Sequence, residues 1–332
     1  MLNKSLFSGL VLALGLACAG EAFSQAAPGP AAPKKVTLAG GSVGGAWSAI
    51  GSAIGETLRR EYPGVSFAYE PGREAANIQL VSQSKVELGI AHAQLAKRAQ
   101  SGEDPFRQPI RNVRALAQLD PEAAVQILVR EDSGIESLRQ IREAKKPVRV
   151  ALNQRGTLMA VAGEEVFRAT GIDPKEIESW GGRFHYVAYN EGLDMMKAGQ
   201  VDLIINMLAF PSGQVTSATR EMRVRLLPLP SDAIARMGDK LGTEEIVIPA
   251  QTYTFQPQAV ETVTGKVVVL ANADMKDDEA EAIVAAMLKH FDYLKSAHAT
   301  LNRLTQASLA NVAPLELHPG AVAAYRKAGL LK

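Results

Sequence analysis

The chain has 332 residues, enough for two domains with sizeable hydrophobic cores. Its 47% hydrophobic and 21% charged residues are the proportions of an ordinary globular protein. The formal net charge of +1 at pH 7 gives no support to binding of nucleic acid or of an anionic membrane. Any charge selectivity must therefore be local.

The N-terminal residues have the pattern of a secretory signal peptide. Residues 1–4 are a short cationic start, residues 6–19 are apolar but too short to span a bilayer comfortably, and small residues follow at 22–24. We expect residues 1–24 to be removed on export to the periplasm and residues 25–35, rich in Ala and Pro, to form a flexible leader. The alternative is a lipoprotein acylated at Cys18, although Gly15 stands where such a signal usually has leucine. Without lipidation the mature chain has no cysteine and needs no disulfide.

Strand and helix patterns alternate from residue 36 onward. Residues 36–39 read as a buried strand, four glycines surround Ser42, and apolar residues then recur at helical spacing as far as Leu58. Further strands are expected at 65–70 and 88–91, each followed by a helix. Repeated strand–helix units predict a mainly parallel sheet with helices on both faces.

The same alternation begins again in the middle of the chain. Strands are expected at 115–119, 125–130, 148–152, 185–189, 201–208 and 267–271, and helices at 135–144, 158–170, 277–298 and about 300–311. Gly171 and Pro174 end the helix of 158–170. Because the chain returns to a strand and helices at its end, we expect two α/β lobes, the first built from residues 36–128 and 258–332 and the second from residues 129–257.

Most catalytic and cofactor patterns are absent from the sequence. The four loop glycines cannot be arranged as a dinucleotide-binding motif, and no phosphate-binding Gly-x-x-x-x-Gly-Lys sequence occurs. The five histidines show no metal-ligand spacing. Residues 40–44 match the Gly-x-Ser-x-Gly pattern of serine hydrolases, but that pattern normally follows several strands and here it follows the first. A hydrolase using Ser42 stays as a remote alternative, and we expect neither enzyme activity nor a cofactor.

A recognition site remains. Ligands of parallel α/β sheets gather beyond the carboxyl ends of the strands, and a strand–glycine loop–helix unit presents free N–H groups to an anion. Arg155 precedes a helix, where it is suited to bidentate contact with a carboxylate, and Ser42 or Thr157 would add a hydroxyl. Trp47 suits either the core or a wall of the site. The residues expected to contact the ligand are Gly41, Ser42, Gly44, Gly45, Trp47, Arg73, His92, Gln94, Gln154, Arg155, Gly156, Thr157 and Pro211.

The chain resembles the TAXI family, the solute-binding subunits of one class of TRAP transporters. The resemblance lies in Gly-Gly-Ser-x-Gly-Gly followed by an aromatic residue at 40–47, and in further short matches at 63–65, 77–80, 86–90, 129–134, 199–202, 248–253 and 314–320. It implies a periplasmic binding protein of the two-lobed kind, type II, with the ligand in the cleft between the lobes. It also implies delivery of a small carboxylate to the subunits of a TRAP-type membrane permease. We expect the protein to act as a monomer.

Three departures from the family pattern bear on the ligand. Arg73 and Arg155 stand where the family usually has small residues, and His92-Ala-Gln94 stands where it usually has Gln-Ser-Asp. If these side chains face the cleft, the site is more cationic than is typical. A dicarboxylate such as a 2-oxo- or hydroxy-acid is then favoured over glutamate. Two alternatives stay open: Arg73 pairs with Glu74 or Glu70, or the protein is a periplasmic sensor for a different small molecule.

Overall fold

The computed structural model describes residues 32–332, with the exception of the Pro121 side chain. The expected signal peptide, Cys18 and most of the expected leader lie outside this range. Between residues 32 and 332, no helix is long and apolar enough to cross a membrane.

The ten strands of residues 32–332 all belong to a single sheet. Its hydrogen-bonded order is β2-β1-β3-β10-β4-β7-β5-β6, with β8 also paired to β4 and β9 to β10. The strands are β1 (Lys35–Gly40), β2 (Ser66–Pro71), β3 (Leu88–His92), β4 (Val113–Arg130), β5 (Arg149–Leu152), β6 (Arg183–Tyr186), β7 (Leu203–Leu208), β8 (Val224–Leu227), β9 (Glu244–Ile248) and β10 (Val260–Asn272).

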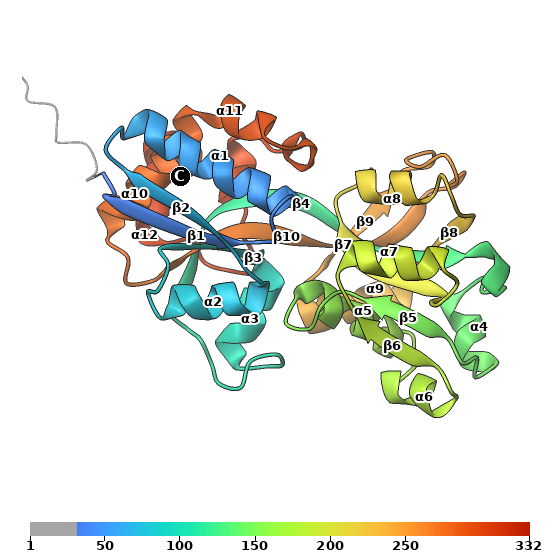
Figure 1. The fold of residues 1–332 in the computed structure, drawn as a ribbon. Coiled ribbons are helices and arrows are strands. Elements are labelled where there is room, and N and C mark those ends of the chain that lie inside the picture. Colours follow the sequence, from blue (N-terminus) through green and yellow to red (C-terminus); the bar gives the residue numbers. More distant parts are fainter. Residues whose placement is uncertain (1–31) are drawn as a thin grey trace, which may run out of the picture.

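The molecule has two lobes joined by the long strands β4 and β10 (Figure 1). Lobe 1 contains the parallel strands β1–β3 and both ends of the described chain. Its helices are α1 (Ala46–Glu61), α2 (Glu74–Ser82), α3 (Ala93–Ser101), α10 (Asp277–Lys289), α11 (Phe291–Ser296) and α12 (Pro319–Lys327). In the view of Figure 1, α1 and α11 lie above the strands and α2 and α3 below them.

Lobe 2 is built around the parallel strands β5, β6 and β7. Its helices are α4 (Leu138–Glu143), α5 (Leu158–Ala169), α6 (Pro174–Ser179), α7 (Tyr189–Lys197), α8 (Gly213–Ala218) and α9 (Ser231–Leu241). Short 3₁₀ turns complete the chain at η1 (Glu131–Ser133), η2 (Ala299–Leu301) and η3 (Ala307–Ala310). The α/β fold with two lobes is as predicted.

The centre of the sheet is antiparallel, unlike the mainly parallel sheet that the alternation predicts. β10 runs antiparallel to β3, β4 and β9, and β4 runs antiparallel to β7 and β8. The two strands expected at 115–119 and 125–130 are one strand, β4, because irregular register against β10 absorbs the polar residues between them. Parallel pairing is therefore confined to the outer strands of each lobe.

The C-terminal region also differs from the prediction. The helix expected over 277–298 is divided into α10 and α11 at His290, and the expected helix near 300–311 is wrong, since only η2 and η3 form there. Leu301, Leu304 and Leu309 are buried in the core without a continuous helix. The spacing of apolar residues in 300–311 thus predicted correctly that they are buried, but predicted the wrong secondary structure.

Strand pairing also bears on the lobe boundaries. In β4, Asp120 pairs with β10 opposite Val267, whereas Ala124 already pairs with Leu208 of lobe 2. We propose that the chain passes between lobes at 120–124 and 264–267, a few residues from the boundaries expected at 128 and 258. The crossings then lie inside two continuous strands.

Candidate functional site at the lobe boundary

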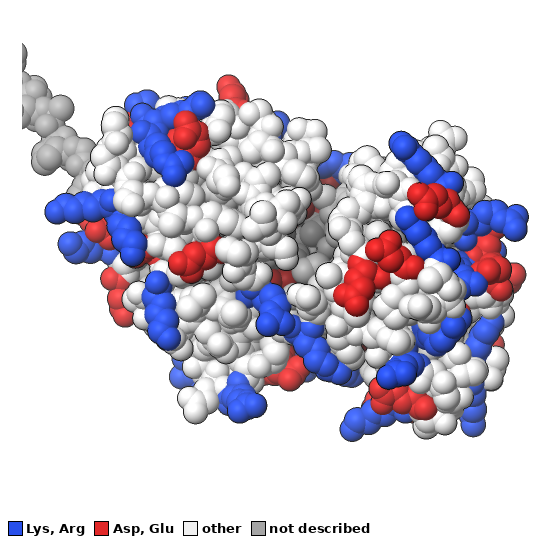
Figure 2. Space-filling view, in the orientation of Figure 1, with Lys and Arg blue, Asp and Glu red and all other residues white. Residues whose placement is uncertain are grey.

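Three strands of lobe 1 end at one edge of the sheet. β1 ends at Gly40, β2 at Pro71 and β3 at His92, and β1 is parallel to both of its neighbours. The expected ligand residues that follow these strands therefore lie at one edge, as predicted for a parallel sheet. In Figure 2 the surface is hollowed between the two lobes on the face shown.

The glycine loop (residues 41–45) leads into a helix whose N-terminus is not capped by a side chain. Gly45 is the N-cap of α1, and the first turn holds no acidic residue. Ser48 and Ala49 donate their N–H groups to the Gly45 carbonyl, but the N–H groups of Ala46 and Trp47 have no acceptor within residues 32–332. Two free amides at the positive end of a 16-residue helix form a favourable place for an anion.

Tyr69 of β2 fixes the start of this loop. Its hydroxyl donates to the Gly41 carbonyl at 2.7 Å. Its ring lies against Gly51 of α1, where any Cβ would overlap it. Burial raises the pKa of Tyr69 to about 12, so the hydroxyl keeps the proton it donates. The loop position thus depends on α1, β2 and a glycine in the helix.

A continuous set of contacts connects α1 with lobe 2. The Trp47 and His92 ring centroids are 5.5 Å apart, and His92 Nδ1 lies 3.0 Å from Glu74 Oε2. The other oxygen of Glu74 accepts the N–H of Leu158, the first residue of α5, at 3.2 Å. Trp47 and His92, both expected at the site, therefore meet there, and Glu74 joins them to lobe 2. The sequence indicated Glu74 only as a partner for Arg73.

Two other expected ligand contacts have their polar atoms engaged within the protein. The Gln94 amide accepts the N–H of Lys266 at 3.1 Å and donates to the Gly242 carbonyl at 3.2 Å. The Thr157 hydroxyl caps α5 by accepting the Ala160 N–H and donates to the Gln154 carbonyl. Both side chains are buried, so we assign them structural roles.

The two arginines on which the ligand prediction depends have different surroundings. The Arg155 guanidinium lies 3.5 Å from the Tyr186 ring centroid and 3.9 Å from Glu164, and its side chain is 70% exposed. It lines a cavity of ≈ 440 Å³ between the lobes with Arg98, Asp104, Arg168 and Lys240 among others. Arg73 is exposed and forms no ion pair within the described chain, so the suggested pairing with Glu74 or Glu70 is not seen. Arg73 is thus the freer cation of the two.

The remaining expected residues lie in the loops of both lobes. Gly41 lies against Trp47, since a Cβ built on it would be 3.2 Å from the Trp47 Cβ. Ser42, Gly44 and Gly45 are exposed. Gln154 is half-buried in the loop before α5, and Pro211 is exposed and preceded by a cis peptide bond before α8. Among residues 32–332, the hydrogen bond found at Ser42 is that of its backbone carbonyl with the Gly45 N–H, and no histidine or carboxylate pairs with its hydroxyl to activate it as a nucleophile.

Asp120 is a buried carboxyl beside this site that no motif in the sequence indicates. It is 7% exposed, and Oδ1 accepts the N–H of Glu122. Burial raises its pKa to about 7, against the opposing influence of His92 and Arg303. Near neutral pH it therefore carries less negative charge than an exposed aspartate and repels an anion less. Only burial across the sheet distinguishes it from other acidic residues, and no local pattern reports that.

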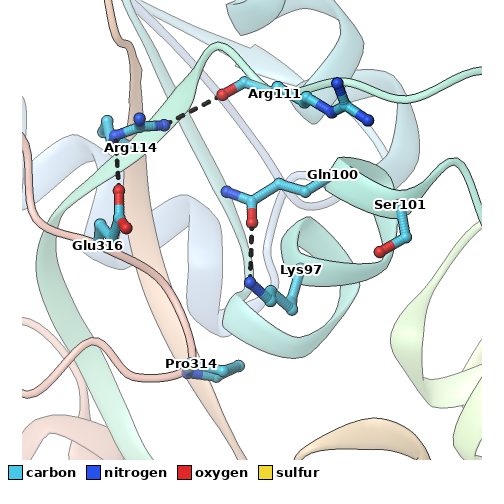
Figure 3. A pocket seen from close by; sticks show the side chains of 7 residues that line it. All are labelled: Lys97, Gln100, Ser101, Arg111, Arg114, Pro314 and Glu316. Carbon is cyan, nitrogen blue, oxygen red and sulfur yellow. Dashed lines mark hydrogen bonds and ion pairs between the residues drawn. The ribbon is translucent and has the colours of Figure 1, made fainter.

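A second hollow lies on lobe 1, away from the strand ends. Figure 3 shows it between α3 and the start of β4, lined by Lys97, Gln100, Ser101, Arg111, Arg114, Pro314 and Glu316. Arg114 is paired with Glu316 at 3.4 Å, and Lys97 donates to Gln100. Its volume is ≈ 370 Å³, but none of the expected ligand residues lines it. No cluster of metal-ligating side chains was found in residues 32–332.

The profile of the NMT1-like family matches residues 38–329. The chain belongs to the NMT1-like family. Among solved structures, malate-bound MatC from Rhodopseudomonas palustris is similar with a TM-score of 0.54 and 13% identity, covering 90% of this chain and 100% of that one. The periplasmic binding protein BugD has a TM-score of 0.51 and 13% identity, covering 90% of this chain and 98% of the other. At these identities the likeness shows the fold, which is that of two-lobed periplasmic binding proteins.

Proposed function

We propose that this NMT1-like protein is an extracytoplasmic solute-binding protein that captures a small carboxylate between its lobes and delivers it to a TRAP-type permease. The observation that carries the proposal is the uncapped N-terminus of α1, with two free amides, beside the Trp47–His92 pair at the edge of the sheet. The malate bound to MatC, which shares the fold, is an anion of the same chemical class. The resemblance to the TAXI family is the basis for proposing a TRAP-type permease as the partner. In this proposal the protein is a periplasmic monomer without a cofactor or catalytic activity.

The preference for a dicarboxylate now depends mainly on Arg73. The α1 N-terminus supplies one place for a carboxylate, and Arg73 is an exposed cation at the end of β2 on the same edge. Arg155 supports the preference less, because it already stacks on Tyr186. We propose a 2-oxo- or hydroxy-dicarboxylate ahead of glutamate, since Arg73 suits the second carboxylate. The acid beside the site, Asp120, is buried, and burial raises its pKa to about 7, so it is a weaker partner for an ammonium group than an exposed carboxylate.

Calorimetry with a Gly45→Asp variant tests the carboxylate site. Gly45 has extended backbone angles that any residue adopts. A Cβ there would lie 3.3 Å from the Ser42 carbonyl oxygen, so this turn must shift slightly to admit an aspartate, whose carboxylate then accepts the free Trp47 N–H as an N-cap. We expect G45D to weaken binding of 2-oxoglutarate about tenfold or more, because its own carboxylate occupies the anion position. Gly64→Asp, at an open surface position, is the matched control and should bind as the wild type does. Equal affinity of G45D and wild type would contradict the site, and clear preference for glutamate would contradict the ligand class.

A further inference from the structure

The two lobes contact each other where α2 and α5 begin. The Ala75 N–H of lobe 1 donates to the Gly156 carbonyl of lobe 2 at 3.0 Å. Gly156 has φ +82, a conformation that favours glycine, and a Cβ added there would lie 3.6 Å from that of Ala75. Main-chain atoms of the two lobes therefore meet directly.

The Glu74 carboxylate lies at the centre of this contact. It is 1% exposed. Oε2 accepts from the backbone N–H of His92 at 3.2 Å and lies 3.0 Å from His92 Nδ1, while Oε1 accepts the Leu158 N–H at 3.2 Å. One buried carboxylate thus binds lobe 1 through one oxygen and lobe 2 through the other.

The Leu158 N–H is the first of the α5 helix, where the backbone leaves its donors unpaired and the helix dipole favours negative charge. The sequence pattern around Arg155 and Thr157 suggests that a ligand carboxylate binds this helix end. The described chain has its own carboxylate there instead.

An independent observation also assigns this cluster to a ligand site rather than to ordinary packing. His92 is 2% exposed, and its Nε2 has no hydrogen-bond partner within residues 32–332. Buried ring nitrogens of this kind are rarely left unpaired in a finished core. Trp47, which packs on His92, belongs to the helix whose N-terminus we assign to the ligand.

We propose that Glu74 is a built-in substitute for an anionic ligand group: it occupies the N-terminus of α5, clasps the lobes together at this edge, and excludes the ligand's carboxylate from that helix. Glu74 is then a positioning and specificity-determining residue. The ligand is left to bind at the N-terminus of α1. This proposal depends on the proposed function in one respect, the assumption that the two lobes move apart.

A chemical rescue experiment tests the clasp in the mature, ligand-free chain. Glu74→Ala removes the carboxylate and leaves a buried site lined by the Leu158 and His92 donors, large enough for a small carboxylate such as formate. We expect amide hydrogen exchange at Ala75 and Leu158 to become about tenfold faster or more, and the radius of gyration to increase. Millimolar formate should restore the protection saturably, because it supplies the missing acceptor.

Two further variants make the result specific. Glu74→Gln keeps the shape of the side chain and one acceptor oxygen. Hydrogen exchange at Ala75 and Leu158 should therefore increase less than in E74A and should not respond to formate. Glu143→Ala removes an exposed carboxylate paired with Arg139 on α4 and should show only a general salt effect. If E74A is poorly folded, formate added during refolding should recover it, whereas chloride should not.

Unchanged protection of Ala75 and Leu158 in E74A, or a formate response no larger than that of E143A, would overturn the proposal. The hydrogen-exchange and formate-rescue measurements are made without the transported ligand. Their result is therefore valid even if calorimetry finds no carboxylate ligand. The calorimetry result is likewise valid if Glu74 does not hold the lobes together.

Discussion

Asp120 is the residue at which burial has the clearest energetic consequence. It lies in β4 opposite Val267 of β10, at the position where we propose that the chain leaves lobe 1. Its pKa rises from 3.8 to about 7 in the folded protein because burial disfavours its charged form. Between these two values the folded state keeps a proton that the unfolded state loses. Stability is therefore lost as the pH rises through this interval.

Replacing Asp120 with Asn should remove this pH dependence. A pKa shift of this size corresponds to at most about 4 kcal/mol, so D120N should gain stability over the wild type from pH 4 to pH 7, on the order of a few kcal/mol. Urea denaturation of both proteins across this range measures it. Asp132→Asn is the opposite case, since its hydrogen bond to Arg130 lowers the pKa of Asp132 and its contribution is lost toward acid. Parallel pH curves for D120N and wild type would contradict the prediction.

The sequence predicted well which loops lie at the same edge of the sheet. It predicted less well which side-chain atoms are free to bind a ligand. Trp47 and His92, both predicted at the site, lie together because they follow β1 and β3, which are parallel neighbours in the sheet. Gln94 and Thr157 were expected to bind ligand, but their partners are backbone groups of Lys266, Gly242 and Ala160. The partners of Gln94 are 148 and 172 residues away in the sequence, and no local pattern indicates them. The bonds of Thr157 are local, because a threonine directly before a helix is a common N-cap.

Among the elements, α5 is central because its N-terminus lies at the lobe contact. Its first turn is held from two sides, by the Thr157 hydroxyl from within lobe 2 and by the Glu74 carboxylate from lobe 1. The sequence predicts this helix at 158–170 almost as it is found, at Leu158–Ala169. What it could not predict is α5 receiving an acidic side chain from residue 74, since that depends on how the two lobes meet.

Thr157→Ala should separate capping from ligand contact. Loss of the cap should cost about 1 kcal/mol of unfolding free energy, measured by chemical denaturation. Ligand affinity should stay close to that of the wild type, because the hydroxyl is engaged with Ala160 and Gln154. Thr157→Ser keeps the hydroxyl and should lose little stability. A large loss of affinity in T157A at normal stability would instead restore Thr157 to the ligand site.

For the whole molecule, the two crossing strands determine how closely the lobes approach. Gly265 of β10 lies between the two lobes. A Cβ added there would be 3.0 Å from Gln94 Oε1 of lobe 1, and 3.0 Å from Met207 Sδ and 3.3 Å from Leu158 Cδ2 of lobe 2. The alternating sequence predicts two lobes, but it does not mark this glycine among the 28 in the chain. Its importance arises only when three distant segments converge on one strand.

Gly265→Ala should therefore act on the relation between the lobes rather than on either core. The added methyl group forces its neighbours to move at a cost of about 1–3 kcal/mol in the conformation where the lobes touch, and this cost is absent once they separate. We expect a larger radius of gyration by solution scattering and a ligand affinity lower by about tenfold for each 1.4 kcal/mol. Gly64→Ala, which meets nothing within 4 Å, should change neither quantity. If G265A instead lowers unfolding free energy while scattering and affinity match the wild type, the glycine serves packing alone and the lobes do not close upon it.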